Sequence, residues 1–235
     1  MRILLVRHGQ TPANVLGTLD TAAPGPGLTE LGQQQAAGVV DALDSEKIDA
    51  IYVSRLRRTH ETAAPLAAVL GLTPTELPGT HEIEAGEVEG RSDRESVRTY
   101  LETVFAWGSG DLSVTMPGGP DGHDFFARFD ESIARVVEAH DQDATVVVVS
   151  HGAAIRVWTG SRVANLGDGF TGENHLDNTG VVVIEGSPET GWTALSWGGT
   201  PVGGARLADP AAEDPLGEAL DESLEESLEE PRDGD

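Results

Sequence analysis

Two histidines, each followed by a glycine, stand out among the residues that could do chemistry. Residues 7–9 read Arg-His-Gly, and residues 150–152 read Ser-His-Gly. A neutral imidazole can act as a nucleophile near neutral pH. The glycine after each histidine lets the chain turn sharply and approach a ligand closely. His8 and His151 are therefore candidates for a shared catalytic site.

Two arginines accompany these histidines. Arg7 directly precedes His8, and Arg58 lies four residues after Ser54, which itself follows an aliphatic run. Guanidinium forks match the oxygens of a phosphate group. Their positive charge should also disfavour protonation of His8, which keeps its imidazole nucleophilic. These residue types predict phosphoryl transfer that relies on electrostatic stabilisation and needs no metal and no other cofactor.

Three aliphatic runs lead into these polar groups and are expected to be strands. They lie at residues 3–6, 50–53 and 145–149. Such short, unalternating runs are typical of strands buried on both faces of a sheet. The carboxyl ends of parallel strands meet in one crevice, where ligands bind. We therefore expect the two histidines and the two arginines to meet there.

Apolar residues at helical spacing separate the strands and complete the expected fold. The alternation predicts an α/β protein, a three-layer α/β/α sandwich with a mostly parallel central sheet and a late hairpin. A helical insertion is expected at about residues 91–140. We expect one domain over residues 1–207, followed by an acidic, disordered tail over residues 208–235. The other expected helices lie at about residues 29–43, 56–70 and 153–158.

Composition narrows the class of partner. The 235 residues carry a formal net charge of −25, and residues 209–235 alone hold twelve acids. This charge argues against nucleic acid or an anionic membrane as a partner. The chain has no cysteine, which excludes disulfides, thiolate metal sites and cysteine nucleophiles. No run of 18 apolar residues occurs, so we expect a soluble, cytoplasmic protein.

Five segments, in this order, resemble motifs of the histidine phosphatase superfamily, also called the phosphoglycerate-mutase-like family. The resemblance spans about residues 2–197. Arg-His-Gly alone is a weak signal, whereas five ordered motifs with the expected elements before them are a strong one. The segments are residues 7–9 with Thr11 and Asn14, residues 28–36 at the entry to the first helix, residues 54–58 with Thr62 and Ala63, residues 82–90 around the proton donor, and residues 150–152 at the second histidine.

The resemblance implies roles for individual residues. His8 would be the nucleophile and Glu82 the proton donor, with His151 as the third catalytic residue. Glu84 and Glu87 stay open as alternatives for the proton donor, because neighbouring positions depart from the family pattern. The residues that would bind the transferring phosphate are Arg7, Asn14, Arg58 and Gly152.

The residues after the expected proton donor separate two branches of the family. In the mutase branch this acid is followed by Arg-His-Tyr-Gly, whereas residues 83–86 here read Ile-Glu-Ala-Gly. Cations that would hold the carboxylate of phosphoglycerate are therefore not evident. We expect a metal-independent phosphomonoesterase that acts on a small phosphorylated metabolite through a phosphohistidine. Two alternatives stay open: a phosphoglycerate mutase, and a catalytically silent module that binds a phosphorylated ligand.

Overall fold

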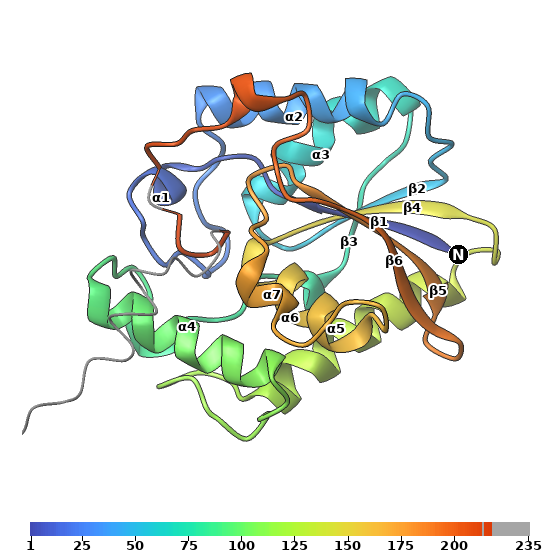
Figure 1. The fold of residues 1–235 in the computed structure, drawn as a ribbon. Helices are drawn as coiled ribbons and strands as arrows, with labels where there is room; N and C mark the ends of the chain where they lie inside the picture. Colours follow the sequence, from blue (N-terminus) through green and yellow to red (C-terminus); the bar gives the residue numbers. More distant parts are fainter. Residues whose placement is uncertain (213, 218–235) are drawn as a thin grey trace, which may run out of the picture.

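The computed structural model describes residues 1–212 and 214–217, and a six-stranded sheet forms its centre (Figure 1). The strand order is β3-β2-β4-β1-β5-β6. The first four strands in this order run parallel, β5 runs antiparallel to β1, and β6 runs antiparallel to β5. The expected mostly parallel sheet and the late hairpin are confirmed. The strands are β1 (Arg2–Arg7), β2 (Ala50–Val53), β3 (Thr75–Glu76), β4 (Thr145–Ser150), β5 (Val181–Ser187) and β6 (Gly191–Gly198).

Helices cover both faces of this sheet, so the expected three-layer sandwich is also confirmed. Figure 1 shows α2 and α3 on one face and α4, α5 and α6 on the other. The α-helices are α1 (Pro12–Val15), α2 (Glu30–Ala42), α3 (Arg57–Leu70), α4 (Arg94–Gly108), α5 (Gly122–Glu138), α6 (Gly152–Arg162) and α7 (Phe170–Glu173). Three short 3₁₀ helices are η1 (Pro78–Thr80), η2 (Gly86–Val88) and η3 (Ala205–Leu207).

The two central strands explain the unalternating aliphatic runs. Residues 3–6 of β1 and 146–149 of β4 are all buried, because α-helices pack on both sides of them. In the parallel register, Arg7 at the end of β1 pairs with Ser150 at the end of β4. The residues that follow these strands therefore emerge side by side at one edge of the sheet.

Local signals set the ends of the two helices on the opposite face. The Thr29 side chain accepts a hydrogen bond from the backbone N–H of Gly32, which caps the start of α2. Gly71 ends α3 with a left-handed φ of 67°, a conformation that favours glycine. The α3 helix is continuous across Pro65. These boundaries lie within a residue or two of those predicted from the sequence.

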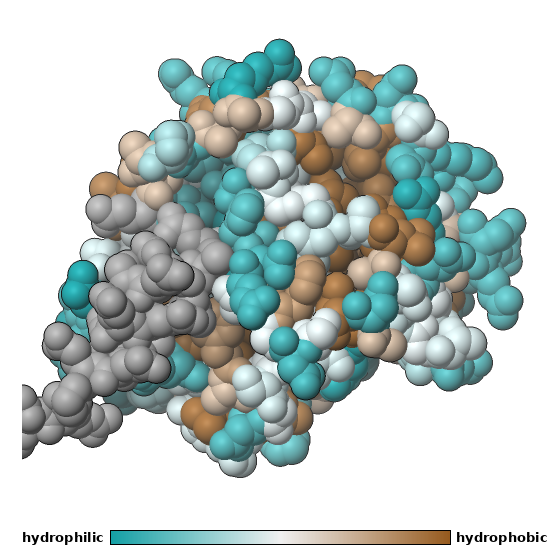
Figure 2. Space-filling model, in the orientation of Figure 1, coloured by the Kyte–Doolittle hydropathy of each residue, from teal (hydrophilic) through white to brown (hydrophobic). Residues whose placement is uncertain are grey.

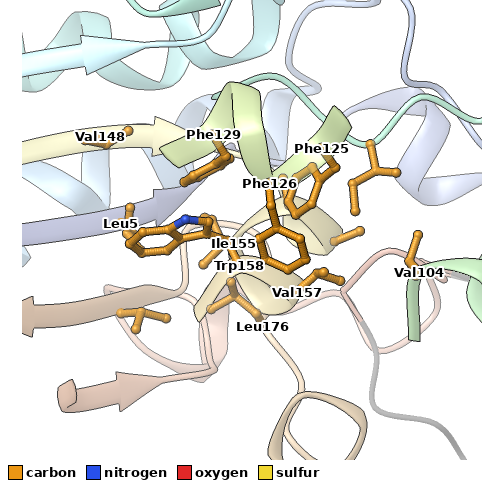
Figure 3. Close-up of a cluster of buried hydrophobic side chains, with 14 of the residues drawn as sticks. Leu5, Val104, Phe125, Phe126, Phe129, Val148, Ile155, Val157, Trp158 and Leu176 are labelled. Atoms are coloured by element: carbon orange, nitrogen blue, oxygen red, sulfur yellow. The ribbon is translucent and has the colours of Figure 1, made fainter. Parts of the chain in front are cut away.

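The segment predicted as a helical insertion belongs to the layer that contains α6. Its helices, α4 and α5, share one hydrophobic core with α6 and with one face of the sheet. Figure 3 shows Phe125, Phe126 and Phe129 of α5 beside Trp158 of α6. The rings of Phe129 and Trp158 stack with centroids 5.2 Å apart. This core holds α6, and therefore the residues at its start, against the sheet.

The chain after β6 packs against the domain further than we expected. We predicted a disordered tail from residue 208 onwards. In the structure, residues 208–212 and 214–217 lie against the domain, and Leu216 is only 4% exposed. The Leu176 N–H also donates a hydrogen bond to the Gly217 carbonyl oxygen. The prediction failed for these residues because it relied on their high density of acidic residues, and a single leucine among them gave no sign that it would be buried. The remaining tail residues, 213 and 218–235, lie outside the described residues.

The surface is mostly polar. Figure 2 shows hydrophilic side chains around the rim of one face, with hydrophobic ones gathered near its middle. The exposed large hydrophobic residues of the described chain, such as Leu16, Val69 and Leu195, fall on separate parts of the fold. Within residues 1–212 and 214–217, no helix combines the length and apolar character that a bilayer crossing requires.

Candidate active site

His8 lies at the carboxyl edge of the sheet, immediately after β1. The side chain is 2% exposed, and its Nδ1 lies 2.8 Å from the carbonyl oxygen of Gly9. When the Nδ1–H donates to this carbonyl, Nε2 keeps a lone pair. Burial and the charges of Arg58 and Arg7 lower the pKa of His8 well below its ordinary value. The ring is therefore held neutral, with Nε2 able to accept a proton or to attack an electrophile.

The turn that carries His8 is fixed by hydrogen bonds to β4 and to α3. The His8 N–H donates to the Ser150 carbonyl oxygen at 3.0 Å, and the Gly9 N–H donates to Oγ1 of Thr62 at 2.9 Å. A Cβ at position 9 would lie 2.7 Å from the Gly32 carbonyl oxygen. Position 9 therefore has to be glycine, because α2 approaches the turn too closely for any side chain.

His151 faces His8 across the site from the end of β4. The centroids of the two rings are 5.2 Å apart. Arg58 Nε donates to Nδ1 of His151 at 3.3 Å, and Nε2 lies 2.7 Å from Oγ of Ser54. With Nδ1 accepting, Nε2 carries the proton and donates to Ser54. Burial, Arg58 and His8 lower the pKa of His151 well below its ordinary value. The second ring is thus also held neutral and in a fixed orientation.

Two buried guanidinium groups flank the histidines. Arg7 is fully buried, and it donates to the Leu176 carbonyl oxygen at 2.8 Å and to Oδ2 of Asp214 at 2.5 Å. Arg58 is 2% exposed and donates to the Asp20 carbonyl oxygen at 2.9 Å. Among the described residues, Nε of Arg7 and Nη1 of Arg58 have no hydrogen-bond partner, although Nη1 of Arg58 lies 3.6 Å from Oδ1 of Asp20. Buried donors without partners are costly, so these two N–H groups indicate a place for an anion.

Glu82 lies between η1 and η2, and its side chain meets the first N–H groups of α6, the helix that follows His151. Its side chain is fully buried. Oε1 accepts from the backbone N–H groups of Ile83 at 2.8 Å and Ala154 at 2.9 Å, and Oε2 accepts from Ala153 N–H at 3.2 Å. Burial raises the pKa of Glu82, although these hydrogen bonds and the charge of Arg58 oppose the shift. A carboxyl group in this environment can hold a proton and release it again.

The two alternative acids occupy other environments. Glu84 contacts His81 at 2.6 Å and Arg128 at 3.1 Å. Burial would raise the pKa of Glu84, but these two partners outweigh it and lower the pKa to about 2. Glu87 is exposed on η2. The geometry therefore favours Glu82 as the group that exchanges a proton at this site.

Asn14 and Gly152 complete the predicted phosphate-binding set. Asn14 in α1 accepts from the Thr11 N–H through Oδ1 at 2.9 Å, and its Nδ2 donates to Oδ1 of Asp214 at 3.1 Å. A Cβ at Gly152 would lie 2.4 Å from the Leu216 carbonyl oxygen. Both residues therefore lie against the segment that contains Asp214.

This order of elements, and the residues at their ends, match a known family. Residues 3–200 match the model of the histidine phosphatase superfamily, branch 1. The chain belongs to this superfamily.

Individual relatives match different shares of this chain. PE-PGRS family protein PE_PGRS11 of Mycobacterium tuberculosis is 43% identical over 216 residues, which are 86% of this chain and 37% of the relative, so this chain spans little more than a third of that protein. The adenosylcobalamin/alpha-ribazole phosphatase of Salmonella typhimurium is 32% identical over 151 residues, 64% of this chain and 74% of the relative. The fold also resembles the structure of a mycobacterial glucosyl-3-phosphoglycerate phosphatase complexed with VO3, with a TM-score of 0.71, 24% identity, and coverage of 85% of this chain and 99% of that one.

The histidine phosphatase fold brings the seven residues singled out in the sequence to one edge of the sheet. Residues 1–212 and 214–217 hold no group of three or more histidine or acidic side chains placed to bind a metal ion. The seven are Arg7 and His8 after β1, Asn14 in α1, Arg58 in α3, Glu82 between η1 and η2, and His151 and Gly152 after β4.

Two further residues of the candidate site were not predicted. Asn178 donates from Nδ2 to the His8 carbonyl oxygen at 3.1 Å. A topological signal could have indicated it, because Asn178 comes just before β5, whose start lies beside the end of β1. Asp214 carried no such signal, since it lies among other acids in the expected tail.

Proposed function

We propose that this chain is a metal-independent phosphomonoesterase that acts through a phosphohistidine on Nε2 of His8. One observation carries the proposal. The His8 imidazole is held neutral, with Nδ1 at the Gly9 carbonyl, by burial and by the charges of two buried guanidinium groups, each with an N–H that lacks a hydrogen-bond partner among the described residues. A nucleophile with a free lone pair beside two cations is suited to attack a phosphoryl group.

In the first step, the Nε2 lone pair of His8 attacks phosphorus, and the bond from phosphorus to the leaving oxygen breaks. Protonated Glu82 gives its proton to that oxygen, so an alcohol leaves rather than an alkoxide. The positive charges of Arg7 and Arg58 stabilise the equatorial oxygens of the transferring group, which is the main contribution in reactions of this type. Asn14 donates a further hydrogen bond.

In the second step, a water molecule replaces the alcohol. Ionised Glu82 takes a proton from this water, whose oxygen attacks phosphorus while the phosphorus–nitrogen bond breaks. The electron pair returns to Nε2 of His8, Glu82 is protonated again, and inorganic phosphate leaves. His151, fixed by Ser54 and Arg58, borders the phosphoryl group throughout. The two arginines supply the charge that a metal ion supplies in other phosphatases.

We further propose that the substrate is a small phosphorylated metabolite. The Salmonella relative is named an adenosylcobalamin/alpha-ribazole phosphatase, and other relatives at about the same identity are named phosphoserine and glucosyl-3-phosphoglycerate phosphatases. The strongly negative net charge of −25 also argues against large polyanionic substrates.

A panel assay tests this function. The purified chain is mixed with a panel of phosphorylated metabolites, with and without EDTA, and released inorganic phosphate is measured. We expect release that EDTA leaves unchanged. His8→Ala should lower the rate by about 1,000-fold or more, whereas His123→Ala, at an exposed histidine on α5, should stay within about twofold of wild type.

Three results would count against the proposal. Phosphate release by the His8→Ala protein at near wild-type rates would reject the nucleophile. Loss of activity in EDTA that Mg²⁺ restores would reject metal independence. Interconversion of 2- and 3-phosphoglycerate without release of phosphate would indicate a mutase instead.

A further inference from the structure

A carboxylate from the C-terminal segment binds two of the groups assigned above to the phosphate. Oδ2 of Asp214 lies 2.5 Å from Nη2 of Arg7, and its Oδ1 accepts from Nδ2 of Asn14 at 3.1 Å. Asp214 is 8% exposed. The two oxygens of this carboxylate thus accept hydrogen bonds from an arginine and from an amide, as two oxygens of a bound phosphate would.

This carboxylate is carried by a segment that we call the C-terminal strap, residues 201–212 and 214–217. In Figure 1 the strap, drawn in red, crosses α2 and then descends beside α1. Side chains of the domain hold it before Asp214: Gln35 Nε2 donates to the Leu207 carbonyl oxygen at 2.7 Å, and Gln10 Nε2 donates to Oδ2 of Asp209 at 2.8 Å. The strap is therefore anchored before the carboxylate reaches the site.

Beyond Asp214 the strap packs directly on the site. Leu216 is buried in the core that contains α5 and α6, and the Gly217 carbonyl accepts the Leu176 N–H at 2.7 Å. A Cβ at Gly217 would lie 1.7 Å from Nη1 of Arg7, so the strap backbone rests on the guanidinium group without space for a side chain.

The reactive groups are buried in the conformation in which the strap is docked. In this conformation the side chains of the nucleophile, the proton donor, the second histidine and both arginines are each at most 2% exposed. A phosphorylated substrate has to reach Nε2 of His8 and to place its oxygens on the donors that Asp214 now occupies. The residues concerned are Arg7, His8, Arg58, Glu82 and His151.

We propose that the C-terminal strap is an autoinhibitory element, whose Asp214 carboxylate competes with the phosphoryl group for Arg7 and Asn14. The inference rests on the proposed function, because it assigns those two groups to the phosphate. Turnover requires the strap to withdraw, so the apparent affinity for a phosphorylated ligand falls in proportion to the fraction of open molecules. A phosphoryl dianion carries more charge than a carboxylate and has three oxygens, so it displaces the strap as its concentration rises.

The strap proposal predicts how inorganic phosphate binds to the full chain. Asp214→Asn keeps the shape of the side chain and removes its charge, and Gly217→Ala drives the strap away from Arg7 without changing charge. Both variants should bind inorganic phosphate about 5- to 50-fold more tightly than wild type in calorimetric titration. Glu189→Gln, which removes an exposed acid in the β5–β6 turn, is the matched charge control and should bind like wild type.

Unchanged or weaker phosphate binding by Asp214→Asn would overturn the strap proposal and would instead make Asp214 a residue that orients Arg7. That result would be accompanied by a fall in kcat, whereas an autoinhibitory carboxylate predicts a fall in KM. Because calorimetry needs no turnover, the two proposals fail separately. Tighter phosphate binding by both variants with no hydrolysis of any ester would support the strap and reject the phosphatase.

Discussion

Replacing Thr62 with valine tests how α3 fixes the turn that carries His8. Thr62 is 1% exposed. Its hydroxyl oxygen accepts from the Gly9 N–H at 2.9 Å and donates to the Arg58 carbonyl oxygen at 2.7 Å. Valine has nearly the same shape but no hydroxyl group. The change therefore leaves the buried Gly9 N–H without a partner and creates almost no cavity.

The size of the effect follows from these two hydrogen bonds. A buried donor that loses its partner costs about 1–3 kcal/mol in the free energy of unfolding. The Gly9 carbonyl also fixes Nδ1 of His8, so a shift of this turn displaces Nε2 from its line of attack. A misplacement of about 1 Å lowers kcat about 100-fold. We expect Thr62→Val to lose about 1–3 kcal/mol of stability and about 10- to 100-fold in kcat.

Thr62→Ser is the matched control, because serine keeps the hydroxyl and loses one methyl group. It should lose about 1 kcal/mol for the missing methyl and keep kcat within about threefold of wild type. Urea unfolding gives the stabilities, and steady-state phosphate release gives kcat. If Thr62→Val kept the kcat of wild type, or if serine and valine lowered kcat equally, the hydroxyl would not position His8.

The remaining predictions concern protonation and packing. Glu82→Gln should lower kcat about 100- to 10,000-fold, more for alkyl than for aryl phosphates, because only poor leaving groups need the proton; equal losses for both would argue against a proton donor. Burial raises the pKa of Glu82 and lowers that of His8, so kcat/KM should persist below the ordinary histidine pKa of about 6.5 and fall as rising pH ionises Glu82, and a kcat/KM that rises steadily with pH would contradict these shifts. His8 and His151 have lowered pKa values in the folded state, whereas unfolded histidines bind protons near pH 6.5, so the free energy of unfolding should drop as the pH falls below about 6.5; urea midpoints at pH 7.5 and 5.5 measure this. Phe129→Ala, at a fully buried ring in the α5–α6 core, should cost about 3–5 kcal/mol, and a loss under about 1 kcal/mol would show that this core can collapse around the cavity.

The sequence predicted the site because its chemistry follows strands that are easy to recognise. Residues 3–6 and 145–149 are continuous aliphatic runs, and such runs occur in parallel strands covered on both faces. Once β1 and β4 are parallel neighbours, His8 and His151 have to emerge together. The pairing of Arg7 with Ser150 places them one residue beyond the same register. Periodicity and topology were sufficient for this part of the site.

Other parts of the site depend on contacts that no local pattern encodes. Glu82 lies in irregular backbone between two 3₁₀ helices, and its contacts with the N–H groups of Ala153 and Ala154 on α6 help to distinguish it from Glu84. Those residues are about 70 positions away in the chain. The separate pairing of Glu84 with Arg128 spans 44 positions of the chain. A choice between neighbouring acids therefore required the tertiary structure.

The strap escaped prediction for a different reason. Charge density is a good guide to disorder because a segment with few apolar residues cannot offset its loss of conformational entropy. In the strap, two contacts offset this loss of entropy. Leu216 packs into the core, and the Asp214 carboxylate pairs with the buried guanidinium group of Arg7. Neither contact follows from composition, because each depends on a pocket made by distant residues.

Direct detection of phosphate on His8 tests the central claim. In Glu82→Gln, an aryl phosphate can still transfer its phosphoryl group without a proton donor, while hydrolysis of the intermediate lacks its base. We predict that this variant, quenched in alkali during turnover and analysed by peptide mass spectrometry, carries an acid-labile phosphate on His8, and that the double variant with His8→Asn carries none. A phosphate found on another residue, or none on His8 while the aryl alcohol is released in a burst, would contradict the account.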